Sequence, residues 1–428
     1  MTPPDWAETL PDHWKAKPLR ASADYVVSNV DKVPAEHEIP VRLCNYTDVY
    51  NNEYITPDLD FMQCTATAEE IAKFGLMIDD VVITKDSESW EDIGVPALVR
   101  ETAADLVCGY HLAVLRPDKR QLDGNFLLRC LQAKPIRIQL ELAANGVTRF
   151  GIPKSEIGAM TVPIPPLSEQ RAIGRYLAVE TARLDSLIAA KVRMIGLMIE
   201  KRRALVLRAV IRGLDLSVHL RNSEVPWLGE IPAHWETRRV AWLFRERDER
   251  GEPDLPLLEV SINTGVALRE FSEDRIESTA ADFNTYKVAR KGDVVFNKMR
   301  MWQGAVGVAP QDGLVSPDYV VACPTGTLSS QYAGLLFRTE AFSAECARRS
   351  HGIVWDRLRL YWEGFREIEV PIPPPAVQVA IVDYLAKEVG KLDALRSGTE
   401  RTITLLKERR AALISAAVTG QIEVRSAA

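Results

Sequence analysis

Residues 163–215 read PIPPLSEQRAIGRYLAVETARLDSLIAAKVRMIGLMIEKRRALVLRAVIRGLD, and the pattern recurs at residues 371–423 as PIPPPAVQVAIVDYLAKEVGKLDALRSGTERTITLLKERRAALISAAVTGQIE. The offset is 208 throughout, with no gap. Chance similarity between two unrelated helices would not keep one register over the whole stretch. The chain therefore carries an internal repeat.

Each copy opens with PIPP, which is typical of an extended segment that stops any element before it. Large apolar residues then return at heptad spacing, which predicts two helices of about 45 residues, roughly 65 Å each. A polar residue interrupts both heptad patterns at the same level, Lys191 in one copy and Thr399 in the other. The positions expected to form the helix seam or bind a partner are Gln170, Ile173, Leu177, Leu184, Leu205, Gln378, Ile381, Leu385, Leu392 and Leu413.

The length of 428 residues allows two or three domains, and the hydrophobic fraction of 46% and charged fraction of 26% are typical of soluble globular proteins. A net charge of −6 counts against a protein that coats nucleic acid non-specifically. Between Ser168 and Arg212, however, basic residues clearly outnumber acidic ones. A local basic face is therefore compatible with an acidic chain.

The six cysteines show no CxxC pair or metal-ligand spacing, which favours free thiols in a reducing compartment and no structural metal. The start, MTPPDWAETL, lacks the basic and apolar regions of a signal peptide, and no run approaches the length of a membrane span. We therefore expect a cytoplasmic protein.

Residues 1–162 are predicted to form a mixed α and β domain with Trp14 as a core aromatic. Strand-like runs occur near 24–30, 81–84, 97–100 and 107–115, and residues 125–144 favour a helix that ends before the Asn145-Gly146 turn.

The block from 216 to 370 repeats this organisation. Pro232, His234 and Trp235 repeat Pro11, His13 and Trp14. GDVVFNK (292–298) echoes DDVVITK (79–85), and LVSPDYVVACP (314–324) echoes LVCGYHLAVLRP (106–117). A helix-prone stretch from 328 to 349 then precedes His351-Gly352, as 125–144 precedes Asn145-Gly146.

The sequence thus predicts an α+β chain with an internal pseudo-two-fold repeat. Its parts are a first domain (1–162), a first repeat helix (163–215), a linker and second domain (216–370) and a second repeat helix (371–428). We expect the helices to be antiparallel, because the first must deliver the chain to the second domain, from which the second helix starts.

Motifs for several catalytic classes are missing. The sequence has no GxxxxGK[ST] phosphate loop, no (Asp/Asn)-Pro-Pro-aromatic methyltransferase motif and no HExxH pair. Two carboxylate–lysine groupings, Asp80 with Lys85 and Asp293 with Lys298, suggest a nuclease metal site, but each acid precedes a predicted strand. We therefore interpret these acids as turn residues.

What remains is a set of candidate nucleic-acid contacts. Arg reads guanine, Asn and Gln read adenine, and Lys mostly neutralises phosphate. The strongest group lies in FNKMRMWQGAVG, although a solvated hairpin with Trp302 turned inward explains that segment equally well. The candidates of the second domain are Asn297, Lys298, Arg300, Trp302 and Gln303, and those of the first are Asn45, Tyr46, Tyr50, Asn51, Asn52, Lys85, Thr148 and Arg149.

Several strings resemble the specificity subunit of type I restriction-modification systems: PIPPLSEQ, PWLGEIPAHWE, NKMRMWQGAVG, VSPDYVV and KERRAALISAAVTGQI. The resemblance implies two target-recognition domains that each read half of a bipartite DNA sequence. It also implies two antiparallel coiled-coil helices that dock two copies of a methyltransferase subunit, and restriction and translocase subunits that join the full complex. The chain itself would have no active site and no cofactor, while partner subunits would bind S-adenosylmethionine, ATP and Mg.

Two departures from the family pattern stand out: the second lead-in has Val377 where the first has Glu169, and the first helix closes on Arg212-Gly213 where the second closes on Thr419-Gly420. Three alternatives stay open. The chain could be a coiled-coil protein-interaction scaffold, an enzyme with degenerate motifs, or the specificity module of a related restriction-modification system.

Overall fold

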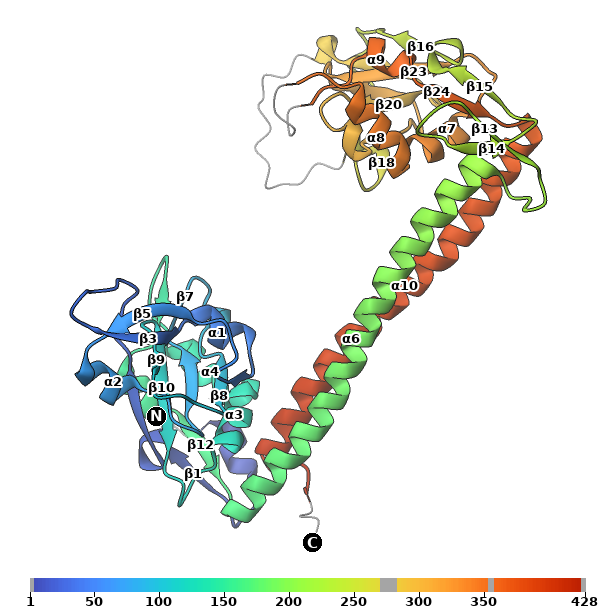
Figure 1. Ribbon diagram of the computed structural model, residues 1–428. Coiled ribbons are helices and arrows are strands. Elements are labelled where there is room, and N and C mark those ends of the chain that lie inside the picture. The colour runs from blue at the N-terminus through green and yellow to red at the C-terminus, as the bar shows by residue number, and fades with distance from the viewer. Residues whose placement is uncertain (1–3, 270–282, 353–357, 425–428) are drawn as a thin grey trace. The chain divides into compact units, whose positions relative to one another are not determined.

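The computed structural model describes residues 4–269, 283–352 and 358–424. The chain divides into two compact units, and the long helices α6 (Leu167–Arg212) and α10 (Pro375–Val418) each contribute to both. Unit 1 comprises Met1–Val192 with Glu400–Ala428, and unit 2 comprises Arg193–Thr399. In Figure 1 the elements are labelled and coloured from blue at the N-terminus to red at the C-terminus, so their order along the chain can be followed.

Unit 1 contains two sheets that hold its core. The five-stranded sheet has the order β2 (Ala23–Val27), β10 (Leu112–Pro117), β6 (Val81–Thr84), β8 (Pro96–Val99) and β4 (Tyr54–Ile55). The three-stranded sheet has the order β5 (Met62–Ala66), β3 (Ile39–Cys44) and β9 (Leu106–Cys108). β6 and β8 are buried along their whole length, which explains why both are continuous apolar runs in the sequence.

Two elements predicted as continuous in unit 1 are divided. The expected strand at 107–115 is β9 and β10, because His111 between them has a φ of 69°, which no strand contains. The expected helix at 125–144 is α3 (Gly124–Gln132) and α4 (Lys134–Ala143). Ala133 is extended between them, and Pro135 falls in the first turn of α4, where proline is well tolerated.

Short elements complete unit 1 and were not expected from the sequence. They are α1 (Tyr46–Asn51), α2 (Ala68–Phe74), α5 (Lys154–Ala159) and the strand pairs β1 (Lys15–Pro18) with β12 (Thr161–Ile164) and β7 (Asp86–Ser87) with β11 (Phe150–Gly151). The β1–β12 pair joins the entry of the domain to the segment just before α6. Trp14, which precedes β1, is buried as expected.

Unit 2 is built on a four-stranded sheet of order β16 (Phe244–Arg247), β23 (Tyr319–Pro324), β20 (Val294–Asn297) and β21 (Val306–Val308). This order corresponds strand for strand to β2, β10, β6 and β8 of unit 1. β15 (Glu236–Arg239) pairs with β24 (Glu369–Ile372), as β1 pairs with β12. The predicted echo of 79–85 in 292–298 therefore coincides with matched strands.

The remaining elements of unit 2 are short. The helices are α7 (Ser330–Phe337), α8 (Glu340–Arg348) and α9 (Trp362–Arg366), and the strand pairs are β13 (Leu220–Asn222) with β14 (Glu230–Pro232), β17 (Leu258–Ser261) with β18 (Gly265–Leu268), and β19 (Lys287–Ala289) with β22 (Gly313–Val315). α7 and α8 divide the predicted helical stretch 328–349, and Thr339 caps the second of them. The capping hydroxyl competes with continuation of one helix.

The long helices run antiparallel within each unit. In unit 1, Asp185 of α6 pairs with Arg410 of α10 at 2.9 Å, and in unit 2, Arg202 pairs with Asp393 at 3.8 Å. Leu177 also shares a core with Val418 in unit 1, and Val210 shares one with Ile381 in unit 2, so in each unit the position on α10 falls as the position on α6 rises. No helix in the described residues is long and apolar enough to cross a membrane.

Candidate nucleic-acid interface

Each unit ends a central strand on a lysine whose backbone is fixed by a distant segment. Lys85 follows β6, and its carbonyl oxygen accepts a hydrogen bond from the Ile152 amide at 2.9 Å. Lys298 follows β20, and its carbonyl oxygen accepts one from the Leu360 amide, also at 2.9 Å. The same backbone contact thus occurs at Lys85 and Lys298, the two lysines that the sequence predicts as DNA contacts.

A bridged backbone pair precedes each of these donors. Asn145 and Gly151 exchange two backbone hydrogen bonds in unit 1, where they close a loop, and His351 and Arg359 exchange two in unit 2. Each unit therefore brings a lysine from a strand end close to a bridged backbone pair. Contacts to DNA phosphates fix the register and orientation of a protein on the duplex. A protein backbone held in this way keeps the cationic and polar side chains in place for such contacts.

In unit 1, α1 places an aromatic pair beside β6. Tyr46 and Tyr50 stack with ring centroids 5.6 Å apart and planes at 15°. The Tyr46 hydroxyl lies 3.3 Å from that of Ser87 in β7, the strand that pairs with Phe150 after the closed loop. Thr148 and Arg149 lie within that loop and are exposed. The structure thus brings Tyr46, Lys85 and the loop together.

The three asparagine candidates lie at the ends of α1. Asn45 is buried, its side-chain amide donates to the Leu43 carbonyl at 3.2 Å, and its backbone N–H donates to Asp48 at 2.7 Å. The Asn52 amide donates to the Asp48 carbonyl at 2.9 Å. Asn45 and Asn52 therefore hold the helix ends, and only Asn51 presents an exposed side chain.

The charge of Lys85 is partly neutralised within unit 1. Its Nζ atom lies 2.8 Å from Asp86, and the other carboxylate oxygen of Asp86 lies 2.7 Å from Nδ1 of His111. Burial acts to raise the pKa of Asp86, but the hydrogen bonds from Lys85 and His111 outweigh it and lower that pKa overall. Asp86 therefore remains ionised at neutral pH and orients Lys85.

The hairpin after β20 is braced from within. The Asn297 side chain accepts from the Met299 amide at 2.9 Å, and the Trp302 indole donates to the Met299 carbonyl at 2.9 Å. Arg300 and Gln303 are exposed on this loop, while Nζ of Lys298 lies 6.0 Å from the centre of the Tyr361 ring. Trp302 is half-buried, and its indole bond stays within the hairpin beside the exposed polar side chains.

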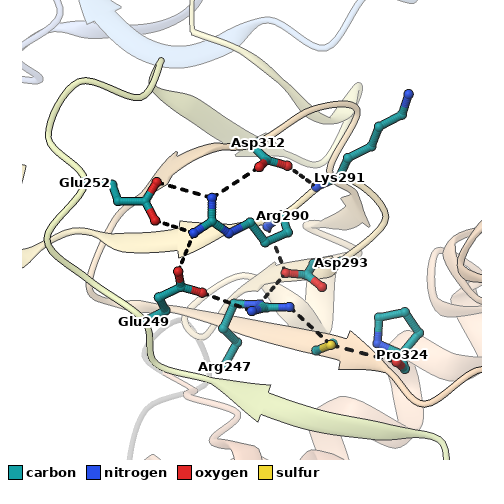
Figure 2. A network of polar contacts seen from close by, with 9 residues as sticks. Arg247, Glu249, Glu252, Arg290, Lys291, Asp293, Asp312 and Pro324 are labelled. Atoms are coloured by element: carbon teal, nitrogen blue, oxygen red, sulfur yellow. Dashed lines mark hydrogen bonds and ion pairs between the residues drawn. The ribbon is translucent and has the colours of Figure 1, made fainter.

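The opposite end of β20 carries an ionic network, drawn in Figure 2. Arg290 bonds to Glu249, Glu252 and Asp312, and Arg247 bonds to Asp293 at 2.8 Å. The Arg290 hydrogen bond holds the pKa of Glu249 below its usual value. Asp293 thus belongs to a structural network at the start of the strand.

Asp80 occupies the matching place in unit 1, with Arg116 at 2.8 Å and the Met77 amide at 2.8 Å. The four residues of β6 separate it from Lys85, so the two are five positions apart along the strand, roughly 16 Å. The two residues therefore cannot form one site, as their interpretation as turn residues requires. Among the described residues, no group of three or more His, Cys, Asp or Glu side chains could hold a metal ion.

The ten seam positions fall into three classes. Ile173, Leu177, Ile381 and Leu385 are buried in the cores that join helix and domain, and Leu184, Leu205, Leu392 and Leu413 are half-buried. Gln170 and Gln378 were expected on the seam, but the structure buries both side chains against domain backbone. A buried, hydrogen-bonded glutamine offers no surface to a partner.

Sequence reasoning missed Asp86, His111 and Tyr361, each of which contacts a predicted lysine or its partner. Asp86 could have been found from its place directly after Lys85. His111 and Tyr361 had no such signal, because their proximity depends on strand pairing and on the backbone bond between Leu360 and Lys298.

Comparison with known proteins shows the class of protein to which this chain is similar. Residues 32–191 match the family model described as "Type I restriction modification DNA specificity domain". The solved HsdS subunit from Thermoanaerobacter tengcongensis shares the fold, with a TM-score of 0.55 and 17% identity over 96% of this chain and 98% of that one. A chain from a structure of the type I R-M system gives a TM-score of 0.67 with 16% identity, covering 96% of this chain and 99% of that one.

Curated relatives carry the same designation. The EcoKI specificity subunit of Escherichia coli is 21% identical over 97% of this chain and 90% of its own length. The MjaX specificity subunit of Methanocaldococcus jannaschii is 23% identical over 53% of this chain, and the StySPI subunit of Salmonella potsdam is 25% identical over 50%. Those two matches span about half the relatives' own length, 52% and 46%. Residues 32–191 thus match the DNA specificity domain of type I restriction-modification systems, and the relatives and solved structures support a specificity subunit of such a system.

Proposed function

We propose that this chain is a non-catalytic subunit that reads a bipartite DNA target with two recognition domains, residues 1–162 and 216–370. The observation that carries the proposal is the matched pair of strand-end lysines, Lys85 and Lys298, each bonded through its carbonyl to a residue that follows a bridged backbone pair. Two such surfaces in one chain substitute for the two subunits of a dimer on an operator.

We propose further that the repeat helices, within 163–215 and 371–428, dock two copies of a methyltransferase subunit. Exposed apolar residues at equal spacing support two equivalent surfaces. Tyr176 and Tyr384 are 37% and 38% exposed, and Leu187 and Leu395 are 44% and 49% exposed. Both pairs are separated by the 208-residue repeat. These residues replace the buried seam positions as the expected partner contacts.

In the full complex, restriction and translocase subunits join, and the partner subunits bind S-adenosylmethionine, ATP and Mg. The complex acts in the cytoplasm. In this proposal the chain contributes DNA contacts and the geometry of the complex, and the chemistry of methyl transfer and cleavage takes place on other subunits.

Salt dependence of binding tests the DNA-reading part of the proposal. The chain co-purified with its methyltransferase subunits should bind duplex DNA with an affinity that falls linearly on a logarithmic salt scale, because phosphate contacts release counterions. A protein-interaction scaffold would show no such slope. Methyl transfer by the highly purified chain alone would contradict the non-catalytic assignment.

Helix length tests the bipartite part. If the helices set the distance between half-sites, one heptad inserted at matched levels of α6 and α10 lengthens each by about 10 Å. B-DNA rises about 3.4 Å per base pair, so the preferred spacer should grow by up to about three pairs. Methylation mapping should then return the same half-sites at a new separation, and the original spacer would contradict the proposal.

A further inference from the structure

One side chain in the first turn of α6, that of Gln170, is completely buried against unit 1. Gln170 is fully buried, and its carbonyl oxygen accepts a hydrogen bond from the Asp123 amide at 2.8 Å. Its side-chain nitrogen donates to the carbonyls of Gln121 and Pro165, both at 2.8 Å. Asp123 is the residue that caps α3. One amide thus joins the lead-in, the start of α6 and the start of α3.

Gln378 makes the same set of bonds in unit 2. Its carbonyl oxygen accepts from the Ser329 amide at 2.7 Å, and its nitrogen donates to Pro373 at 2.8 Å and Thr327 at 3.4 Å. Ser329 caps α7 as Asp123 caps α3. The side chains around the two glutamines differ, but all the bonded partners are backbone groups.

In each unit, a tryptophan also packs beside the end of a long helix: Trp235 beside the end of α6 in unit 2, and Trp14 beside the end of α10 in unit 1. Gly213, just after α6, has a φ of 76°, and a Cβ there would lie 3.2 Å from the Trp235 ring. Gly420, just after α10, has a φ of 71°, and a Cβ there would lie 2.4 Å from Pro11 and 3.5 Å from Trp14. Trp14 and Trp235 are buried. Each domain is therefore attached to one helix start and one helix end.

These contacts have different physical consequences. The apolar contacts of Ile173, Leu177, Ile381 and Leu385 hold each domain on its helices, but the hydrophobic effect has no directional preference. Two of the three hydrogen bonds of each glutamine cross to the domain backbone, and because hydrogen bonds are directional, rotation of the domain about the helix start would break both at once. Loss would also leave buried backbone groups without partners.

We propose that Gln170 and Gln378 are positioning residues that fix the angle between each recognition domain and its helix. They thereby determine how strictly the complex discriminates the spacer between half-sites. This inference rests on the proposed bipartite reading of DNA. It adds that spacer discrimination depends on the rigidity of the two domain–helix junctions as well as on helix length.

The test uses the complex with its methyltransferase subunits and the variants Gln170→Met and Gln378→Met, which keep side-chain length and remove the hydrogen bonds. Duplexes carry the mapped half-sites with spacers from two pairs shorter to two pairs longer than the preferred one. We expect methylation at non-preferred spacers, relative to the preferred one, to rise by at least roughly fivefold in each variant, because fivefold is the effect of one lost hydrogen bond and each variant loses three. Ser168→Ala, an exposed change on the same turn, should leave this ratio unaltered.

The outcomes separate the two proposals. If the wild-type complex discriminates spacers and both variants do so equally well, the positioning role is overturned and the bipartite reading stands. If the wild-type complex recognises no spaced pair of half-sites, both are overturned. A loss of methylation that is equal at every spacer indicates a purely structural role and also overturns the inference.

Amide hydrogen exchange on the chain itself supplies a second measurement that needs no DNA. Gln170→Met should accelerate exchange of the Asp123 amide without changing the Ser329 amide, and Gln378→Met should do the reverse. Unchanged exchange of both amides in both variants would overturn the inference even if the DNA assay failed.

Discussion

The two junctions between domain and long helices share their backbone hydrogen bonds and differ in their side chains. In unit 1, the end of α10 is attached through charge: Glu53 lies 2.9 Å from the fully buried Arg129 and 2.9 Å from Arg410. In unit 2, the buried bond at the end of α6 is neutral, from the Tyr332 hydroxyl to the Val210 carbonyl at 2.6 Å, and the ion pair of Arg212 with Glu230 at 3.1 Å is exposed. The geometry is common to both units, but the interactions that stabilise it are not.

The two junctions therefore differ in what is lost when one of their contacts is removed. Breaking a buried ion pair leaves an uncompensated charge, whereas losing a neutral hydrogen bond leaves only a polar group without a partner. The first junction should therefore be more sensitive to substitution and to acid than the second.

The largest expected effect is that of Glu53→Gln. It should destabilise unit 1 by about 3 kcal/mol, because Arg129 would keep its charge in a site with no access to water. Tyr332→Phe is the matched change in unit 2 and should cost about 1 to 2 kcal/mol. Amide hydrogen exchange, followed separately in each unit, measures both losses of stability. A larger loss from Tyr332→Phe than from Glu53→Gln would contradict the greater sensitivity of the unit 1 junction.

Lowering the pH should destabilise the junction of unit 1 more than that of unit 2. Burial acts to raise the pKa of Glu53, but the attraction of Arg129 and hydrogen bonds lower it from 4.5 to about 2. A lowered folded-state pKa stabilises the native state above the unfolded value, and that stabilisation is lost as the pH falls from about 4.5 towards about 2. The stability difference between wild type and Glu53→Gln should shrink across this window. A constant difference would mean that Glu53 is not ionised at neutral pH in the folded chain.

These junctions mark the limit of what the sequence predicts. The 208-residue repeat locates both long helices, and the echoes of 79–85 and 106–117 locate matched strands, because each pattern is local or repeated. Glu53, Arg129 and Arg410 are distant from one another in sequence, and only Arg410 has a counterpart at the 208-residue offset, Arg202. Gln170 and Gln378 were noticed through the repeat, but their role could not be, since it depends on backbone groups at 121–123 and 327–329.

The strand-end lysines extend the comparison to the candidate DNA interface. Asp86 neutralises Lys85 in unit 1, while Met299 follows Lys298 in unit 2. We therefore expect Lys298→Ala to weaken DNA binding more than Lys85→Ala, and to do so uniformly across sequences. Arg300→Ala and Gln303→Ala should instead relax the choice of bases, at about 1 to 3 kcal/mol for a lost bidentate contact.

Affinity at several salt concentrations and methylation mapping separate these effects. The control is Lys291→Ala, an exposed lysine beside the ionic network at the other end of β20. If neither Arg300→Ala nor Gln303→Ala changes affinity or the methylated sequence, the hairpin after β20 does not read bases.

The smallest expected effect concerns the residue before each positioning glutamine. Glu169 lies 3.0 Å from His13 and accepts a hydrogen bond from the Trp14 indole at 2.9 Å, whereas Val377 packs its side chain against the core of unit 2. The ring arrangement behind them is nearly the same: His13 and Trp14 are edge to face at 6.5 Å, and His234 and Trp235 at 6.4 Å. The carboxylate is therefore not needed to place the tryptophan. Glu169→Val should cost under about 1 kcal/mol, because His13 and Glu169 are largely exposed and the Trp14 bond is the main loss. Val377→Glu should be close to neutral if the new carboxylate reaches the Trp235 indole, and destabilising if it stays against the apolar core. Thermal unfolding of the two reciprocal variants measures both. A loss of several kcal/mol from Glu169→Val would show that unit 1 depends on this carboxylate for its geometry, and that the two junctions are less alike than their backbone bonds indicate.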